Sequence, residues 1–375
     1  MKYLFTFTFT FFTLINLAQA SEKKVIPEKI LIGQSIELSG EATGKENREG
    51  ALAYFNWINS QGGVYGRQIE LRTYDDKRKP EITKMNTEKL IKEDHALALF
   101  GYRSTPTVEA VLPMLISEKI PMIAPFSGAQ TLHHPFNPYL FHLRASYQDE
   151  TIQMVESLLP LEINKIAILH QDDPFGKDGL AGFEKNLALH NLKAIVVAKY
   201  DRKDLKIDEA VSEIATTSPQ AVLMACTPSA CADFVKKIHK KGLYPRFLML
   251  SNVSSDSFFK SLSDDGRGVG VMQVMPYPKD ISAIVVREFQ HVLKGMDSPP
   301  PVSYATLEGF LAAKLLTEAL RRAGPAVTRE KLLLALNGMR NVDLGGVKVS
   351  YTQNMHDGSK FVELTVIGKN GAIQR

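Results

Sequence analysis

Short apolar runs alternate with amphipathic stretches along most of this 375-residue chain, and this alternation limits the folds open to it. Residues 96–100 are typical of a buried strand, because they are short, apolar and bounded by polar segments, and residues 30–36 also predict a strand. Residues 81–93 have the apolar spacing of a helix. Strands that alternate with helices form parallel sheets with helices on both faces. Two such series, and a chain too long for one comfortable core, predict an α/β protein of two lobes.

The first series consists of strands 30–36, 68–74, 96–100 and 121–124 and helices 49–61, 81–93 and 108–117. The second consists of strands 165–170, 194–199, 221–225 and 247–250 and helices 179–190, 205–216 and 230–241. After a further strand, 269–274, the pattern changes to helices 281–293, 306–323 and 329–336 and strands 347–351 and 361–367.

The first twenty residues have the pattern of an export signal. Lys2 is followed by an apolar run over residues 4–17 and by Ala18-Gln19-Ala20, a small-x-small cleavage site. The alternative is a membrane anchor, but the run is shorter than the roughly 20 apolar residues that span a bilayer. We therefore interpret residues 1–20 as a secretory signal peptide and expect a soluble exported protein that begins near Ser21.

Charge and cysteine content bear on nucleic-acid binding, disulfide formation and metal binding. The net charge of +4 is small and its residues are interspersed, so we expect no nucleic-acid partner. Cys226 and Cys231 could form a disulfide in an oxidising compartment, although their spacing alone does not decide it. Two cysteines without a nearby His do not predict a metal site, and we expect no cofactor.

Hydroxyl residues and a proline lie where a strand gives way to a helix, in Gly101-Tyr102-Arg103-Ser104-Thr105-Pro106-Thr107. Ser104 or Thr105 can cap the helix, and Pro106 suits its first turn. The free N–H groups of such a turn can also bind a ligand carboxylate. Both interpretations, an ordinary capped helix and an anion site, fit the residues.

Ligands of open parallel sheets bind beyond the carboxyl ends of the strands. Small hydroxyl residues, Gly and an aromatic recur in the segments that follow the predicted strands, as expected for a site that holds a small polar molecule. Turn and cap chemistry explains any one of these segments, but together they favour a cleft. The segments are 39–44, 102–107, 125–128, 171–176, 226–229 and 251–252.

Enzyme motifs are not evident. Gly266-Arg267-Gly268-Val269-Gly270 lacks the dinucleotide-binding spacing and precedes a strand. The chain has neither a P-loop nor a G-x-S-x-G elbow. His133-His134 lacks a metalloprotease context, and Asp172-Asp173 fits the capping of a turn before Pro174. The sequence therefore predicts a binding protein and no enzyme.

Several motifs together resemble the periplasmic substrate-binding proteins of ABC importers, of the branched-chain amino acid type. The resemblance spans about residues 30–367. It depends on Leu38-Ser39-Gly40, Asn56-x-x-Asn59-x-x-Gly62-Gly63-Val64-x-Gly66-Arg67, Tyr74-Asp75-Asp76, 101–107, Ile120-Pro121, 144–150, Gln171-Asp172-Asp173-x-Phe175-Gly176 and Pro219-Gln220-Ala221-Val222.

This resemblance implies two Rossmann-like lobes with parallel sheets, joined by three crossovers and able to close on a ligand. The crossovers would lie near 143–144, 275–276 and 351–352. The first lobe would combine residues 25–143 with 276–351, and the second 144–275 with 352–375. The resemblance also implies a periplasmic location and a monomer.

The family's motifs also imply a ligand site. Thr105, with help near Thr107, matches the residue that holds the ligand carboxylate, and Phe126 and Gly128 match further contacts. Phe175 matches an aromatic of the other lobe, and Thr227 falls near another. Together with the loop residues, the predicted ligand contacts are Tyr102, Ser104, Thr105, Thr107, Phe126, Ser127, Gly128, Tyr147, Asp173, Phe175, Thr227 and Ser251.

Two departures from the family pattern bear on the ligand. The acidic residue that holds an amino acid's ammonium group falls near Ser251-Asn252, where no carboxylate stands. Arg103 replaces a small residue; it could add a second anionic contact, but we expect it to point to solvent. The chain would then bind a small polar ligand and deliver it to a membrane ABC permease. Alternatively, a membrane sensor would detect the bound state.

Overall fold

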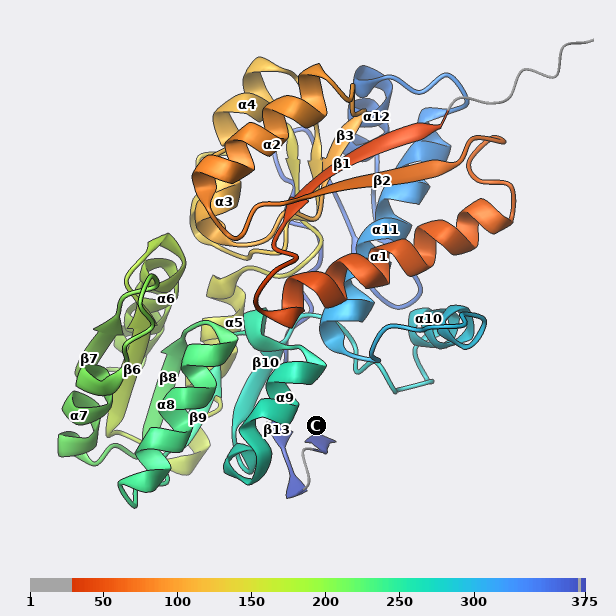
Figure 1. Ribbon diagram of the computed structural model, residues 1–375. Helices are drawn as coiled ribbons and strands as arrows, with labels where there is room; N and C mark the ends of the chain where they lie inside the picture. Colours follow the sequence, from red (N-terminus) through yellow and green to blue (C-terminus); the bar gives the residue numbers. More distant parts are fainter. Residues whose placement is uncertain (1–28, 370–371) are drawn as a thin grey trace, which may run out of the picture.

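The computed structural model describes residues 29–369 and 372–375 and has two α/β lobes (Figure 1). The predicted signal peptide lies outside these residues. The sheet of the first lobe is parallel throughout and has the order β2-β1-β3-β4-β5. Its strands are β1 (Ile30–Ile36), β2 (Ile69–Asp75), β3 (Ala98–Phe100), β4 (Met122–Ile123) and β5 (Leu140–Phe141).

The second lobe contains a seven-stranded sheet of order β14-β13-β10-β9-β8-β6-β7. Five of its strands are parallel, whereas β13 pairs antiparallel with β10 and β14 pairs antiparallel with β13. The strands are β6 (Ile166–Gln171), β7 (Ala194–Tyr200), β8 (Ala221–Ala225), β9 (Arg246–Met249), β10 (Gly270–Gln273), β13 (Glu363–Ile367) and β14 (Ile373–Gln374).

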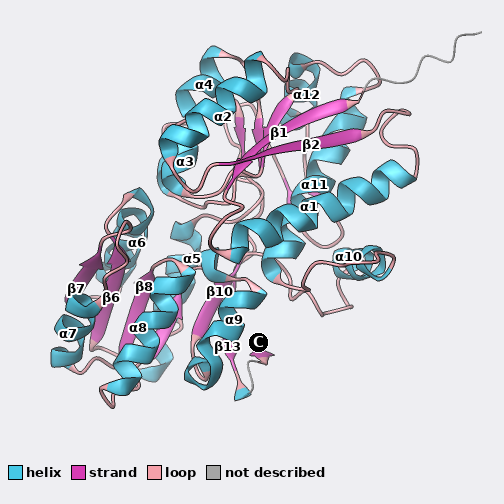
Figure 2. Ribbon diagram, in the orientation of Figure 1, coloured by secondary structure: helices cyan, strands magenta, loops and turns pink. Residues whose placement is uncertain are grey.

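Helices cover both faces of the first sheet (Figure 2). The long helices α1 and α11 cross closely: a Cβ on Gly309 of α11 would lie 1.8 Å from the carbonyl oxygen of Asn47 of α1. The helices of this lobe are α1 (Ala42–Ser60), α2 (Pro80–Lys92), α3 (Thr105–Glu109), α4 (Leu112–Ser117), α10 (Ile284–Lys294), α11 (Tyr304–Ala323) and α12 (Arg329–Asn337). A short ribbon, β11 (Val342–Asp343) with β12 (Lys348–Val349), follows α12.

The strands of the second sheet direct successive side chains to opposite faces. Ile166 and Ile168 pack in the core that contains α5 and α6, whereas Ala167 and Leu169 pack in the core that contains α7, α8 and α9. These helices are α5 (Tyr147–Glu156), α6 (Pro174–Leu189), α7 (Asp208–Thr217), α8 (Pro228–Lys240) and α9 (Asp256–Leu262). Short 3-10 turns are η1 (Gln130–Leu132), η2 (Leu159–Leu161), η3 (Ser251–Val253) and η4 (Ser263–Gly266).

The chain passes between the lobes three times. It leaves the first sheet after β5, leaves the second after β10, and returns to the second at β13. The helices α10 and α11 pack against α1, so this late segment belongs to the first lobe. The three predicted crossovers fall within these connecting segments; the residue-level lobe boundaries stay a prediction.

Five helices differ from the sequence-based prediction. Two of them are α6, which begins at Pro174 instead of 179, and α9, which was not predicted. The helix predicted over 108–117 is divided into α3 and α4, because Pro113 cannot continue a helix through the preceding turn. The helix α1 begins at Ala42 instead of 49, since its polar first turns carry no apolar periodicity. The helix α5 was not predicted, although Ser146 and Asp149 form a capping box at its start. Within the described part of the chain, no helix is both long and apolar enough to cross a membrane.

Candidate ligand cleft between the lobes

A cavity lies between the lobes, at the carboxyl ends of strands from both sheets. Its volume is about 20 Å³, which is room for about one water molecule. A solute as large as an amino acid therefore requires the lobes or the lining side chains to move apart. The cavity is lined by Arg78, Arg103, Ser104, Thr105, Phe126, Tyr147, Gln171, Phe175, Thr227 and Asn252.

A larger cavity of about 510 Å³ lies elsewhere, between α9 and the segments 277–279 and 302–304. It contains none of the predicted ligand contacts and lies away from the strand ends that face each other. We therefore assign the candidate site to the smaller cavity, because its position follows from the parallel sheets.

The turn after β3 provides the first lobe's side of the cavity. Ser104 has a φ of 84°, which turns the chain sharply before α3 begins at Thr105. Ser104 occupies the N-cap position but its side chain makes no capping hydrogen bond, and Thr105 is the first residue of the helix. The prediction that one of these two hydroxyls caps the helix is therefore wrong. The Thr105 hydroxyl lies 2.8 Å from that of Ser127, and the Thr107 hydroxyl donates to the backbone carbonyl of Ser104 over 2.8 Å. Thr105 is thus at the cavity, whereas Thr107 braces the turn.

Arg103 is buried, with only 5 % of its surface exposed, so the expectation that it points to solvent is wrong. Its Nη1 donates to Oε2 of Glu37 over 2.8 Å, and its Nη2 lies 3.6 Å from Oε2 of Glu41. Two carboxylates offset the cost of removing the guanidinium from water. Burial raises the pKa of Glu37, against the opposing effect of Arg103 and of Arg78, whose Nε lies 3.7 Å from the Glu37 carboxylate.

Three aromatic side chains form an apolar wall of the cavity. The rings of Tyr147 and Phe175 meet edge to face with centroids 5.3 Å apart. The buried guanidinium of Arg144 lies over the ring of Phe126, 4.7 Å from its centroid. Burial raises the pKa of Tyr147 to about 12, so its phenol stays neutral at physiological pH.

Asn252 lines the cavity from the second lobe. Its amide nitrogen donates to the backbone carbonyl of Cys226 over 2.9 Å, which fixes the orientation of the side chain. Its Oδ1 is buried and has no hydrogen-bond partner within the described residues. The neighbouring residue, Ser251, instead accepts a bond from Arg144 and donates to a buried carboxylate, that of Glu150, over 2.8 Å. A neutral amide side chain therefore lines the cavity near the position where the resemblance implied an acidic residue.

The structure brings together six of the predicted contacts at the cavity: Ser104, Thr105, Phe126, Tyr147, Phe175 and Thr227. The other six are Tyr102, Thr107, Ser127, Gly128, Asp173 and Ser251, which lie close by but do not line it.

Some of these neighbours contact residues that line the cavity, and the others contact residues further from it. The Tyr102 hydroxyl lies 2.9 Å from that of Thr87, and the Gly128 carbonyl accepts from the backbone N–H of Tyr147 over 2.7 Å. Asp173 caps α6 by accepting from the backbone N–H of Gly176. Their contacts favour positioning roles.

Sequence reasoning missed Arg78, Gln171 and Asn252 as lining residues, and it missed the carboxylates beside Arg103. Arg78 lies in the segment after β2, a strand end of the first lobe that was not considered. The same rule about strand ends would have identified it. Gln171 and Asn252 fall in segments that were considered, but nothing in their residue types set them apart from turn residues.

Two further observations concern the cysteines and possible metal ligands. Cys226 and Cys231 form a disulfide, with Cα atoms 5.6 Å apart, at the start of α8. Among the residues that the structure describes, no group of three or more His, Cys, Asp or Glu side chains is placed to hold a metal ion.

Two α/β lobes, joined by three crossings and closed around a small cavity, define the class of two-lobed ligand-binding proteins. A sequence profile described as "Periplasmic binding protein" matches residues 29–372. The chain therefore belongs to the periplasmic binding protein family.

Two solved structures and one curated protein illustrate the relationship. A substrate-binding periplasmic protein from Ralstonia solanacearum is 33 % identical, with a TM-score of 0.87 over 92 % of this chain and 99 % of that one. A possible leucine/isoleucine/valine-binding protein from Rhodopirellula baltica is 27 % identical, with a TM-score of 0.88 over 93 % and 96 %. An "Amino acid binding protein" from Pseudomonas aeruginosa is 20 % identical over 57 % of this chain and 57 % of its own length.

Proposed function

We propose that this protein is a periplasmic receptor that captures a small polar solute in the cleft and delivers it to an ABC permease. The observation that carries the proposal is the cavity itself, where cationic, hydroxyl, aromatic and amide groups from both lobes converge. Such convergence of a few polar groups on an apolar wall is typical of small-molecule sites. Lobe closure would bury the solute, and its binding would stabilise the closed arrangement.

The groups at the cavity favour a solute of the amino acid, amide or carboxylate type. Arg78 and Arg103 suit an anionic group, and Thr105 can hydrogen-bond the same end of the molecule. Asn252 offers an acceptor without a charge, which suits an amide or another neutral donor better than an ammonium group. The names of the relatives from Rhodopirellula baltica and Pseudomonas aeruginosa support an amino acid or a related compound.

The partners follow from the same reasoning. The receptor would act as a monomer, would reach the periplasm through its signal peptide, and would perform no catalysis. A membrane sensor in place of a permease is the second candidate, because a closed receptor presents the same surfaces to either partner.

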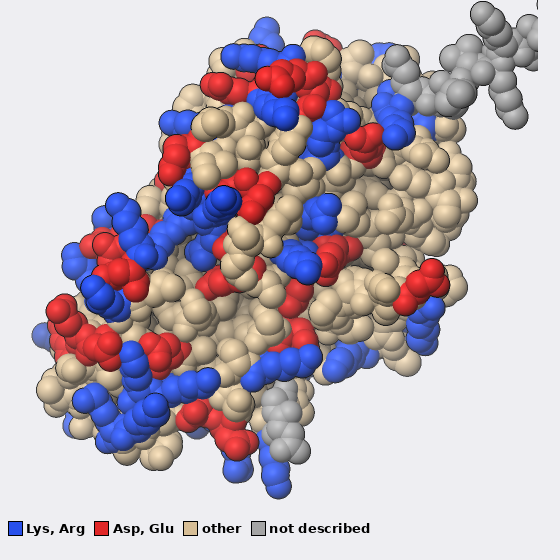
Figure 3. All heavy atoms as spheres, in the orientation of Figure 1, with Lys and Arg blue, Asp and Glu red and all other residues tan. Residues whose placement is uncertain are grey.

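Acidic and basic side chains are mixed over the visible face, without a large area of one sign (Figure 3). Such a surface gives no support to a nucleic-acid partner.

A thermal-shift screen of the mature protein tests this proposal. The panel should contain amino acids, short amides, carboxylates, aromatic acids and polyamines. A solute that binds only the folded state raises the melting temperature, by an amount that grows with its concentration over Kd. One class of solutes should therefore stand out. A flat response over the whole panel, at millimolar concentrations, would contradict a receptor for these solutes.

A further inference from the structure

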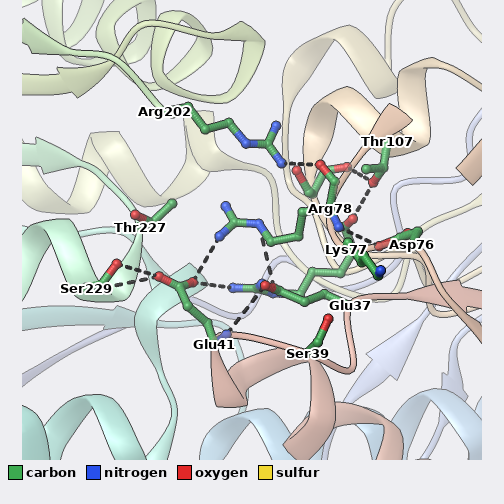
Figure 4. Close-up of polar contacts among 12 residues, drawn as sticks. Glu37, Ser39, Glu41, Asp76, Lys77, Arg78, Thr107, Arg202, Thr227 and Ser229 are labelled. Atoms are coloured by element: carbon green, nitrogen blue, oxygen red, sulfur yellow. Dashed lines mark hydrogen bonds and ion pairs between the residues drawn. The ribbon is translucent and has the colours of Figure 1, made fainter. Parts of the chain in front are cut away.

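The carboxylate of Glu41 connects the two lobes. Glu41 occupies the N-cap position of α1 in the first lobe, yet its side chain makes no capping bond to that helix. Its Oε1 instead accepts from the backbone N–H of Ser229 over 3.2 Å and from the Ser229 hydroxyl over 2.9 Å (Figure 4). Ser229 lies in the first turn of α8, in the second lobe. The first turn of a long helix favours an anion.

The other oxygen of the same carboxylate faces two arginines. Oε2 of Glu41 lies 3.2 Å from Nη1 of Arg78 and 3.6 Å from Nη2 of Arg103. Both arginines line the cleft cavity, and Arg103 is buried. Burial by itself would raise the pKa of Glu41, but the two arginines and Ser229 more than offset it and lower the pKa. Donors from both lobes thus surround one ionised carboxylate.

Charge balance at this point leaves no place for a second anion. Arg78 and Arg103 face Glu37 and Glu41, two positive charges against two negative charges. The nearby Arg202 is already paired with an aspartate of its own lobe and also donates to the backbone carbonyl of Arg78. A solute carboxylate that entered beside Glu41 would be an unpaired negative charge in a cavity of about 20 Å³.

These contacts lead to one proposal, which rests on the proposed receptor function. We propose that Arg78, Arg103 and Ser229 form a carboxylate subsite of the cleft, which Glu41 fills in the absence of solute and which a solute's carboxylate takes over. The residues before α1, Leu38 to Gly40, are exposed, so Glu41 has room to swing outward. Glu41 is then an internal competitor that sets both the preference for carboxylates and the resting closure of the lobes.

The test uses Glu41→Ala and small-angle scattering without any transport solute. Truncation removes the atoms of an acetate ion, so acetate can occupy the place that the side chain leaves. We expect Glu41→Ala to have a larger radius of gyration than the wild type, because a link between the lobes is lost. Acetate should restore the wild-type profile, whereas its neutral analogue acetamide should not. Glu49→Ala, on the solvent side of the same helix, is the matched control and should scatter like the wild type.

A second variant tests the arginine half of the subsite. In Glu41→Ala/Arg78→Gln, restoration of the compact profile should need about tenfold more acetate, the loss expected for one charge-assisted hydrogen bond. A compact profile for Glu41→Ala would overturn the proposal, and so would equal effects of acetate and acetamide. If Glu41→Ala does not fold, Glu41→Gln replaces it and should open partially, since an amide oxygen still accepts from Ser229. The solute screen can fail without affecting this result, and the reverse also holds.

Discussion

The hydroxyl oxygens of Thr105 and Ser127 lie 2.8 Å apart, and this contact joins the ends of two neighbouring strand segments at the cavity. Thr105 begins α3 after β3, and Ser127 follows β4. Because the two strands are parallel neighbours, their carboxyl ends emerge side by side. The pair fixes the side chain of Thr105, a residue that lines the cavity where a solute would bind.

Thr105→Val should weaken solute binding. The variant keeps the shape of the side chain but removes the hydroxyl, which leaves a buried polar group of the solute unpaired at a cost of about 1–3 kcal/mol. Calorimetric titration with the solute found in the thermal-shift screen measures the loss. Thr216→Val, on an exposed turn of α7, is the matched control and should bind as the wild type does. Unchanged affinity in a folded Thr105→Val protein would remove Thr105 from the site.

Glu150→Gln should change how stability depends on pH. Burial raises the pKa of Glu150 to about 7, although Arg144 opposes this effect. A folded-state pKa above the unfolded value of about 4.3 means that this group stabilises the fold at low pH and that the contribution is lost as pH rises through about 7. Glutamine does not titrate, so the stability of the variant relative to the wild type should rise between about pH 4 and pH 7, the interval between the two pKa values. Urea unfolding over that range measures the difference, and a constant difference would contradict the raised pKa.

The buried side chain of His142 should affect the pH dependence of stability in the opposite direction, because it lowers stability as the pH falls. Burial lowers its pKa well below the ordinary value, and the stacked ring of His133 adds to this effect. Below about pH 6.5, His142 is protonated in the unfolded chain but stays neutral in the folded protein. The free energy of unfolding therefore falls as the pH falls below that value, by about 1.4 kcal/mol per pH unit.

His142→Phe isolates this contribution, because phenylalanine keeps a ring against His133 but does not titrate. Its free energy of unfolding should fall less steeply than that of the wild type between about pH 6.5 and pH 5. Chemical unfolding at a series of pH values gives both slopes. Equal slopes would show that His142 takes up its proton in the folded state.

Removal of the disulfide should destabilise the start of α8. The Cys226–Cys231 bond closes a short loop, for which the chain-entropy argument gives about 2 kcal/mol. A double variant, Cys226→Ser with Cys231→Ser, should lose about that much free energy of unfolding. Reduction should destabilise the wild type by a similar amount and leave the variant unchanged. Equal stability of the oxidised wild type and the variant would show that the bond contributes nothing.

Local patterns predicted most of the secondary structure. Apolar runs correspond to β3 and β8, because strands buried on both faces are mostly apolar along their length. The pattern failed where helices carry little apolar periodicity, as at the start of α1 and throughout α5. It also extended a helix across Pro113, where the missing N–H divides α3 from α4.

By itself the sequence determined the α/β alternation and the strand ends where Thr105, Phe126 and Phe175 meet, because strand formation and the position of strand ends are local properties. Only the tertiary structure decided that Arg103 is buried and paired with carboxylates. Its partners, Glu37 and Glu41, lie more than sixty residues earlier in the chain, and a guanidinium is buried only where such partners meet it. The link from Glu41 to Ser229 depends in the same way on the placement of two lobes, which no local pattern contains.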